Sequence, residues 1–246
     1  MKVGIGIICI GDRYLKDFKV TFKPSIVSYA QRHGYDLKVF NHFLDSTYTH
    51  TDSISFQKCL VPENMLEYDR VLIMDADIWL SDSAPLIPDT GDLVGIVNEA
   101  AQVESDLYNK IGFASQPVDY YKLSGFELDT DKLLNTGFIV CNPKLHAKFM
   151  RDVYDKYIKS ARGHHRGFHY EQSCIGYELQ MHNLFTLLPN TWNTIYLFYS
   201  ALQLPHPQVY GMHFAGLHSY AARESQLRRY LTVHIKQGVR RWGICK

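Results

Sequence analysis

Short, continuous apolar runs alternate with helix-like segments along the first hundred residues, and this alternation limits the fold of the chain more than any other feature. Residues 3–10 are rich in Ile and Val, as expected for a strand that is covered on both faces. Residues 24–32 then show helical spacing, opened by Pro24 and closed at Gly34, and residues 35–40 alternate as a second strand. This order predicts a βαβ unit whose first strand is central and parallel to its neighbours.

The same alternation continues further along the chain. Residues 55–68 have helical spacing, and residues 70–74, 93–97 and 138–141 are typical of buried strands. We therefore predict an α/β fold, with a Rossmann-like, mostly parallel central sheet and helices on both faces. A last amphipathic helix is expected over residues 225–238, where it would cap the domain.

Length and charge limit the classes of partner. A chain of 246 residues suits one domain with a continuous core. The 26 Lys and Arg residues against 25 Asp and Glu residues give a formal charge of +1, so no nucleic-acid partner is expected. No stretch approaches the roughly 20 apolar residues of a membrane span.

The cysteines indicate the compartment. Their number is odd and they lack the paired spacing of metal sites, so we interpret them as reduced, mostly buried thiols. Reduced thiols favour a reducing compartment and hence a soluble, cytoplasmic protein. The five residues are Cys9, Cys59, Cys141, Cys174 and Cys245.

Two acids, Asp75 and Asp77, directly follow the apolar strand at residues 70–74. In open α/β sheets ligands bind beyond the carboxyl ends of the strands. Neighbouring carboxylates repel each other, and their burial beside an apolar strand is costly unless a cation compensates. The pattern favours a divalent metal site, although two solvated turn acids would give the same sequence.

The retaining GT-A glycosyltransferases, especially glycogenin and the lipopolysaccharide galactosyltransferases, have a donor-binding motif that resembles residues 71–77, VLIMDAD. Further segments resemble the same families in the same order along the chain. They are residues 11–14 (GDRY), 56–59 (FQKC), 134–138 (LNTGF), 171–172 (EQ) and 212–216 (MHFAG). The resemblance implies a single GT-A domain, with a nucleotide-binding half at 1–100, an acceptor and catalytic half at 101–222 and a C-terminal helix at 223–246.

Asp75, Asp77 and His213 form the expected metal site. They would supply two carboxylate oxygens and one imidazole and leave positions open for diphosphate oxygens. This set suits Mn²⁺, with Mg²⁺ second, and the ion would neutralise charge on the departing nucleotide diphosphate. The alternative for His213 is a histidine that is satisfied within the core.

The resemblance also implies which residues bind the nucleotide sugar, a UDP-sugar. Tyr14 would face the base and Lys58 the diphosphate, although a surface aromatic and a solvated helix lysine are the alternatives. Small residues would let the backbone approach the ligand closely. The expected donor site comprises Cys9, Ile10, Gly11, Tyr14, Lys58, Asp75, Ala76, Asp77, Asn135, Thr136, Gly137, Gly216 and His218.

The catalytic candidates are Glu171 and Gln172. Glycosyl transfer passes through an oxocarbenium-like state, which a carboxylate near the anomeric carbon can stabilise or attack. Glu171 would take this role and Gln172 would bind the donor sugar, and the resemblance implies retention of anomeric configuration. The alternative is that Glu171 caps a helix beginning near Gln172.

The chain departs from the family pattern at two points. A lysine that binds phosphate in glycogenin-like enzymes is missing after Gly216, and His218 is the expected substitute as a phosphate donor. Glu171 stands where the family has Asp, which adds one methylene group. Aromatic residues at 120, 121, 126 and 192 would either face an acceptor sugar or pack in the core.

These observations predict a metal-dependent enzyme that moves a hexose-type sugar from a nucleotide diphosphate sugar to a hydroxyl group of a glycan or glycoprotein acceptor. The identity of the hexose stays open. A Mg²⁺-dependent phosphohydrolase of the haloacid-dehalogenase type, which also has D-x-D after an apolar strand, is one alternative. A nucleotide-sugar-binding protein without turnover is the other.

Overall fold

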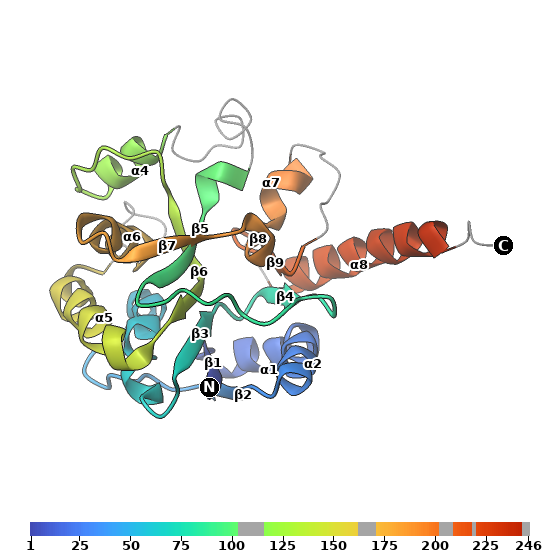
Figure 1. Ribbon diagram of the computed structural model, residues 1–246, viewed down its shortest axis with the longest axis horizontal. Helices are drawn as coiled ribbons and strands as arrows, with labels where there is room; N and C mark the ends of the chain where they lie inside the picture. Colours follow the sequence, from blue (N-terminus) through green and yellow to red (C-terminus); the bar gives the residue numbers. More distant parts are fainter. Residues whose placement is uncertain (103–115, 162–170, 202–208, 218–219, 243–246) are drawn as a thin grey trace.

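A six-stranded sheet forms the centre of the computed structural model, which describes residues 1–102, 116–161, 171–201, 209–217 and 220–242 (Figure 1). Its strands lie in the order β2 (Asp36–Phe40), β1 (Val3–Ile8), β3 (Arg70–Met74), β6 (Leu134–Cys141), β5 (Val94–Asn98) and β7 (Phe185–Leu188). β1 pairs in parallel with β2 and β3, and β5 pairs in parallel with β7. Only β6 runs antiparallel to its neighbours among these six strands. The predicted mostly parallel sheet is thus confirmed, and the first strand is parallel to both neighbours but lies next to the edge strand β2 and not at the centre.

A second, three-stranded sheet is built from short strands that the sequence pattern did not indicate. Its order is β4 (Ile78–Leu80), β9 (Gly211–His213) and β8 (Thr194–Ile195). β4 and β9 are antiparallel, and Ile78 lies opposite His213. Because Asp77 immediately precedes β4, this pairing brings Asp77 next to a residue that is 136 positions later in the sequence.

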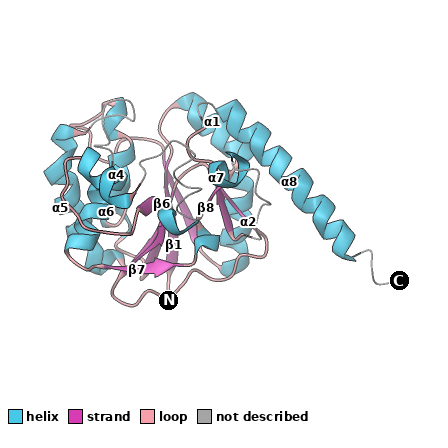
Figure 2. Cartoon of the chain, turned by 90° about the horizontal axis from the view of Figure 1, so that it is seen from above, coloured by secondary structure: helices cyan, strands magenta, loops and turns pink. Residues whose placement is uncertain are grey.

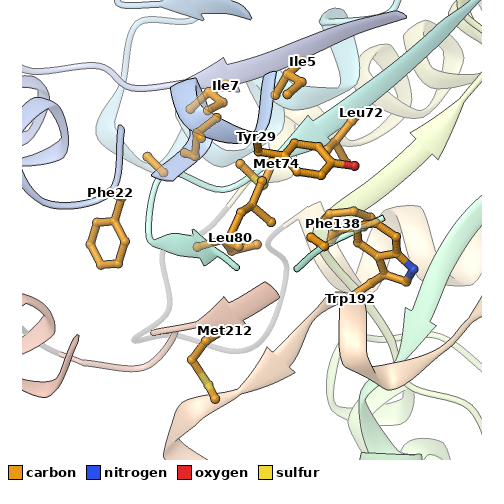
Figure 3. Packing of buried hydrophobic residues seen from close by; sticks show 14 of the residues in the cluster. Ile5, Ile7, Phe22, Tyr29, Leu72, Met74, Leu80, Phe138, Trp192 and Met212 are labelled. Atoms are coloured by element: carbon orange, nitrogen blue, oxygen red, sulfur yellow. The ribbon is translucent and has the colours of Figure 1, made fainter. Parts of the chain in front are cut away.

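Side chains alternate between the two faces of the central sheet, as the period of a strand requires. On one face, Leu72 and Met74 pack with residues of helices α1 (Asp12–Thr21) and α2 (Lys23–His33), as Figure 3 shows in part. Helix α8 (Tyr220–Trp242) adds Leu227 and Tyr230 to this cluster and then extends away from the body of the molecule (Figures 1 and 2). The predicted helix at 225–238 lies within α8.

The opposite face is covered by helices α5 (Pro143–Tyr157) and α6 (Glu171–Met181) and by the segment that follows β2. Val71 and Ile73 point to this side. The helical stretch predicted over residues 55–68 forms two short 3-10 helices, η2 (Ser55–Leu60) and η3 (Glu63–Met65), in place of an α-helix, with η1 (Thr51–Ser53) before them. Pro62 lacks the amide hydrogen that a continuous α-helix would need there.

A small third cluster joins helix α4 (Pro117–Leu123) to β8 and helix α7 (Tyr196–Ala201). Tyr120 and Tyr121 are buried within it, and Trp192 is buried in the cluster that contains Met74. Phe126 stacks on Tyr177 with 4.4 Å between the ring centroids. Of the two interpretations for these aromatic residues, packing is the one that the structure supports.

Four of the five cysteines are free and buried, as expected: Cys9, Cys59, Cys141 and Cys174. Cys245 lies outside the described residues. Over the part of the chain that the structure describes, no helix combines the length and the apolar character needed to cross a bilayer.

Candidate active site

Backbone hydrogen bonds fix the two acids at the end of β3. The amide of Asp75 donates to the carbonyl of Gly137 on β6, at 2.9 Å. The amide of Phe214, just after β9, donates to the carbonyl of Asp77 at 3.0 Å. Both acids are therefore held by backbone hydrogen bonds to segments that are distant in sequence, unlike acids in an unrestrained, solvated turn.

The structure brings Asp75, Asp77 and His213 together, as the sequence predicted. Nε2 of His213 is 3.2 Å from Oδ1 of Asp77 and 3.7 Å from Oδ2 of Asp75. One ligand atom from each of the three residues lies within 4.8 Å of the others. Two carboxylate oxygens and one imidazole nitrogen at this spacing fit a divalent cation such as Mn²⁺ or Mg²⁺.

Burial and charge act in opposite directions on these groups. Burial alone would raise the pKa of Asp77, but the neighbouring His213 and Arg223 outweigh it and lower that pKa. Burial alone would lower the pKa of His213, and the charge of Asp77 outweighs it, so the pKa of the imidazole is raised. Asp77 therefore stays ionised, which a metal ligand requires.

Gly137 lies directly under the imidazole ring of His213. A Cβ atom built at this position would be 2.3 Å from Cε1 and 2.7 Å from Nδ1 of His213. Atoms cannot approach this closely, so a side chain at 137 would force the ring to move. A glycine here is needed for the position of the histidine.

We expect Gly137→Ala to weaken Mn²⁺ binding roughly 10- to 100-fold while the fold is kept, because it displaces a candidate metal ligand. Isothermal titration with Mn²⁺ measures the effect. Gly95→Ala on β5 is the matched control, since its added Cβ meets Thr90 and Leu188 rather than His213. Equal Mn²⁺ affinities for the two variants would contradict the prediction.

Lys58 connects the acid pair to the catalytic candidate. Its buried Nζ lies 2.7 Å from Oδ1 of Asp75 and 2.8 Å from Oε1 of Glu171, and it also donates to the carbonyl of Thr136. The hydroxyl of Thr136 donates to Glu171 at 3.1 Å. Burial by itself would lower the pKa of Lys58, but the two carboxylates outweigh it and raise the pKa. Lys58 is therefore a charged residue inside the site, and the solvated helix lysine is excluded.

Glu171 is the first residue of α6, which is where an acid that caps the helix would lie. The side-chain contacts, however, direct its carboxylate toward Lys58 and Thr136, next to Asp75. Gln172 points to a buried acid that the sequence did not single out, because its Nε2 donates to Oε2 of Glu99 at 3.3 Å. Glu99 thus belongs to the surroundings of the candidate site.

Sequence reasoning missed two further polar residues, Asn193 and Arg223. Nδ2 of Asn135 donates to Oε2 of Glu99 at 2.7 Å, and Asn193 lies between Asn135 and His213. Arg223, in the first turn of α8, has its Nε 3.3 Å from Oδ2 of Asp77. Neither Asn193 nor Arg223 lies in a recognisable motif, although Arg223 falls at the start of the predicted C-terminal helix.

Tyr14 lies on α1 beside the same acids. The guanidinium carbon of Arg223 is 6.0 Å from the centroid of its ring. Burial, followed by the charge of Asp77, raises the pKa of Tyr14 well above 10, so the phenol stays neutral. Gly11, at the start of α1, has φ = 105°, and Gly216 has φ = 76°, a region that glycine favours.

Other residues of the expected donor site differ in placement. Ile10 is partly buried at the end of the β1 segment. Cys9 and Ala76 have almost no exposed surface, and their side chains belong to the core cluster that contains Met74. His218 lies outside the described residues.

Comparison with family models and with curated protein sequences finds no match. Comparison with solved structures does. A glycosyltransferase involved in the glycosylation of the major capsid of PBCV-1 is similar with a TM-score of 0.61 and 16% sequence identity, over 93% of this chain and 100% of that chain.

Two further structures are similar at comparable levels. An active-site mutant of LgtC has a TM-score of 0.54 and 13% identity, over 92% of this chain and 95% of that chain. The bifunctional glycosyltransferase WbbM has a TM-score of 0.53 and 14% identity, over 88% of this chain and 46% of that chain. The chain has the GT-A glycosyltransferase fold.

Proposed function

We propose that this protein transfers a sugar from a nucleotide diphosphate sugar to an acceptor hydroxyl, with a divalent cation held by Asp75, Asp77 and His213. The observation that carries the proposal is the convergence of these three ligands, from the ends of β3 and β9, beside the Lys58–Glu171 pair. The fold supports a transferase over the phosphohydrolase alternative, because similar folds belong to glycosyltransferases.

The residues around the cation site would have different roles in the reaction. When bound, the cation would neutralise charge on the departing diphosphate. Lys58 and Thr136 hold the carboxylate of Glu171 in one position, where it would stabilise positive charge at the anomeric carbon. Tyr14 and Gly11 lie at the carboxyl end of β1, where the base of the nucleotide would bind.

The finer assignments belong to the same proposal. The donor is a UDP-sugar carrying a hexose, the cation is Mn²⁺ or Mg²⁺, and transfer retains the anomeric configuration. The acceptor is a glycan or glycoprotein, and the enzyme works in the cytoplasm. Residues 1–100 bind the nucleotide, residues 101–222 provide the acceptor and catalytic half, and the part from residue 223 on contains most of helix α8 (Tyr220–Trp242).

A thermal-shift panel of nucleotide sugars, with and without Mn²⁺, tests the proposal. A bound donor raises the melting temperature by mass action, and we expect this increase only when Mn²⁺ is present. Turnover should release a nucleoside diphosphate together with free or transferred sugar. Release of phosphate from simple monoesters would support the hydrolase, and binding without turnover would support the binding protein.

Arg223 provides a positive charge near the position where the phosphate-binding lysine of glycogenin-like enzymes is missing. Its contact with Asp77 places the guanidinium at the edge of the cation site, where it would also meet the diphosphate. We expect Arg223→Gln to raise the KM for the donor about tenfold, since one charge-assisted contact contributes about 1.5 kcal/mol or more.

Arg228→Gln is the matched control, because Arg228 lies on the same helix and its guanidinium pairs with Glu224, away from the site. Steady-state kinetics with the donor at fixed Mn²⁺ measure both variants. A donor KM for Arg223→Gln that equals that of the control would remove Arg223 from the donor site.

A further inference from the structure

A continuous series of side-chain hydrogen bonds leads from the imidazole of His213 to a buried acid. Nδ1 of His213 is 2.9 Å from Oδ1 of Asn193. Nδ2 of Asn193 donates to Oδ1 of Asn135 at 2.7 Å, and Nδ2 of Asn135 donates to Glu99 at 2.7 Å. All four side chains are buried, and they come from β9, η7 with the residue that follows it, β6 and η4 (Glu99–Gln102). Here η7 is Asn190–Trp192.

The direction of each hydrogen bond in this series is fixed by a backbone amide next to Asn135. An N–H group only donates, and the amide of Gly137 donates to Oδ1 of Asn135 at 2.9 Å. Asn135 therefore turns its NH₂ group toward Oε2 of Glu99. A flipped Asn135 amide would lose the contact with Gly137 and place its NH₂ group against that amide.

The same argument fixes the orientation of the Asn193 amide. Because the oxygen of Asn135 accepts, Asn193 must present its NH₂ group to Asn135 and its own oxygen to His213. An amide oxygen cannot donate, so the hydrogen of that last bond belongs to Nδ1 of the imidazole. Nε2, the atom that faces Asp75 and Asp77, is then the nitrogen left to bind a cation.

The backbone around Asn193 is fixed as well. Nε2 of Gln102 donates to the carbonyl of Asn193 at 2.7 Å. Oε1 of Gln102 accepts from the amide of Ile195 at 2.8 Å. The side chain of Asn193 is therefore placed before any ligand arrives, and a placed partner of this kind costs no reorganisation on binding.

We propose that Asn193, oriented through Asn135 by Glu99, is a positioning residue that holds His213 in the tautomer with hydrogen on Nδ1 and directs Nε2 to the cation. This inference rests on the proposed function for the cation site. Metal-ligating histidines commonly donate their second nitrogen to such a partner, which fixes the ring.

The tautomer of His213 can be read by ¹⁵N NMR of the imidazole nitrogens in protein loaded with Zn²⁺, a diamagnetic stand-in for Mn²⁺. The His213→Gln variant identifies the signals. We expect Nδ1 to carry the hydrogen and Nε2 to bind Zn²⁺. Coordination of Zn²⁺ through Nδ1, or no coordination by His213, would overturn the proposal.

The variant Asn193→Leu tests the role directly. It removes the acceptor for Nδ1 without adding a charge, and we expect Mn²⁺ affinity, measured by titration, to fall roughly 10- to 100-fold. Its imidazole signals should show a mixture of tautomers. Asn190→Ala is the matched control, because Asn190 donates to the carbonyl of Ala101 and lies outside the series.

The readouts separate this inference from the proposed function. A wild-type protein with hydrogen on Nδ1 but no turnover of any nucleotide sugar would leave the role of Asn193 standing and refute the transferase. Asn193→Leu protein that binds Mn²⁺ as tightly as the Asn190→Ala control, with one tautomer, would refute the role of Asn193. It would leave the proposed transferase standing. If Asn193→Leu does not fold, the wild-type NMR measurement still decides the question.

Discussion

Replacement of Asp77 by Asn should reduce Mn²⁺-dependent sugar transfer roughly 1000-fold, because loss of a metal ligand removes several kcal/mol of transition-state stabilisation. Asn has nearly the same size, and the carbonyl contact with Phe214 is made by the backbone, so the fold should survive. The variant should also lose the Mn²⁺-dependent increase in melting temperature with nucleotide sugars. Turnover assays and a Mn²⁺ titration measure the two effects.

Asp89→Asn is the control for Asp77→Asn. Asp89 also pairs with an arginine, Arg70, at 2.6 Å, but it is a surface acid outside the candidate site. Its replacement should leave Mn²⁺ binding and turnover unchanged. Full activity of the Asp77→Asn variant in Mn²⁺ would show that this carboxylate holds no metal and would refute the proposed cation site.

Replacement of Lys58 by Met should destabilise the metal-free protein by about 3 kcal/mol, because it leaves Glu171 buried without its cation and Asp75 partly so. For a domain of this size, that corresponds to a melting temperature lower by roughly 6–12 °C. Adding Glu171→Gln should recover part of the loss, since it removes one of the two charges. Denaturant unfolding in the presence of a chelator measures these differences.

The matched control is Lys156→Met. Lys156 also pairs with a buried acid, Glu178, at 2.7 Å, but its own side chain is 58% exposed. Water would replace this lysine, and the expected loss of stability is below about 1 kcal/mol. Similar unfolding free energies for the two variants would show that Lys58 is not a buried structural cation.

The sequence by itself was sufficient for five of the six strands of the central sheet, and it missed β7 and the antiparallel direction of β6. Strands covered on both faces need continuous apolar runs, and the runs at β1 and β3 are long enough to be recognised without tertiary information. The pair Asp75 and Asp77 was equally visible, because acids directly after a buried strand have few structural reasons to be there. Helix α2 was predicted well, since Pro24 and Gly34 mark its ends.

The segment before β3 shows where a local pattern misleads. Residues 55–68 have helical spacing, yet they form short 3-10 helices packed against β1, where Gly4 and Gly6 leave room for Met65 and Val61. The spacing reported which side chains are buried and gave no information on the hydrogen-bond pattern, which Pro62 interrupts.

Only the tertiary structure decided the partners of each polar residue. The strands β4, β8 and β9 are two or three residues long, too short for a periodic signal, but their pairing places His213 beside Asp77. The contacts of Asn193 and Arg223 likewise depend on which strands and helices become neighbours. Local sequence reports burial and the ends of elements, whereas the identity of a hydrogen-bond partner 20 or more residues away is set by packing of the whole chain.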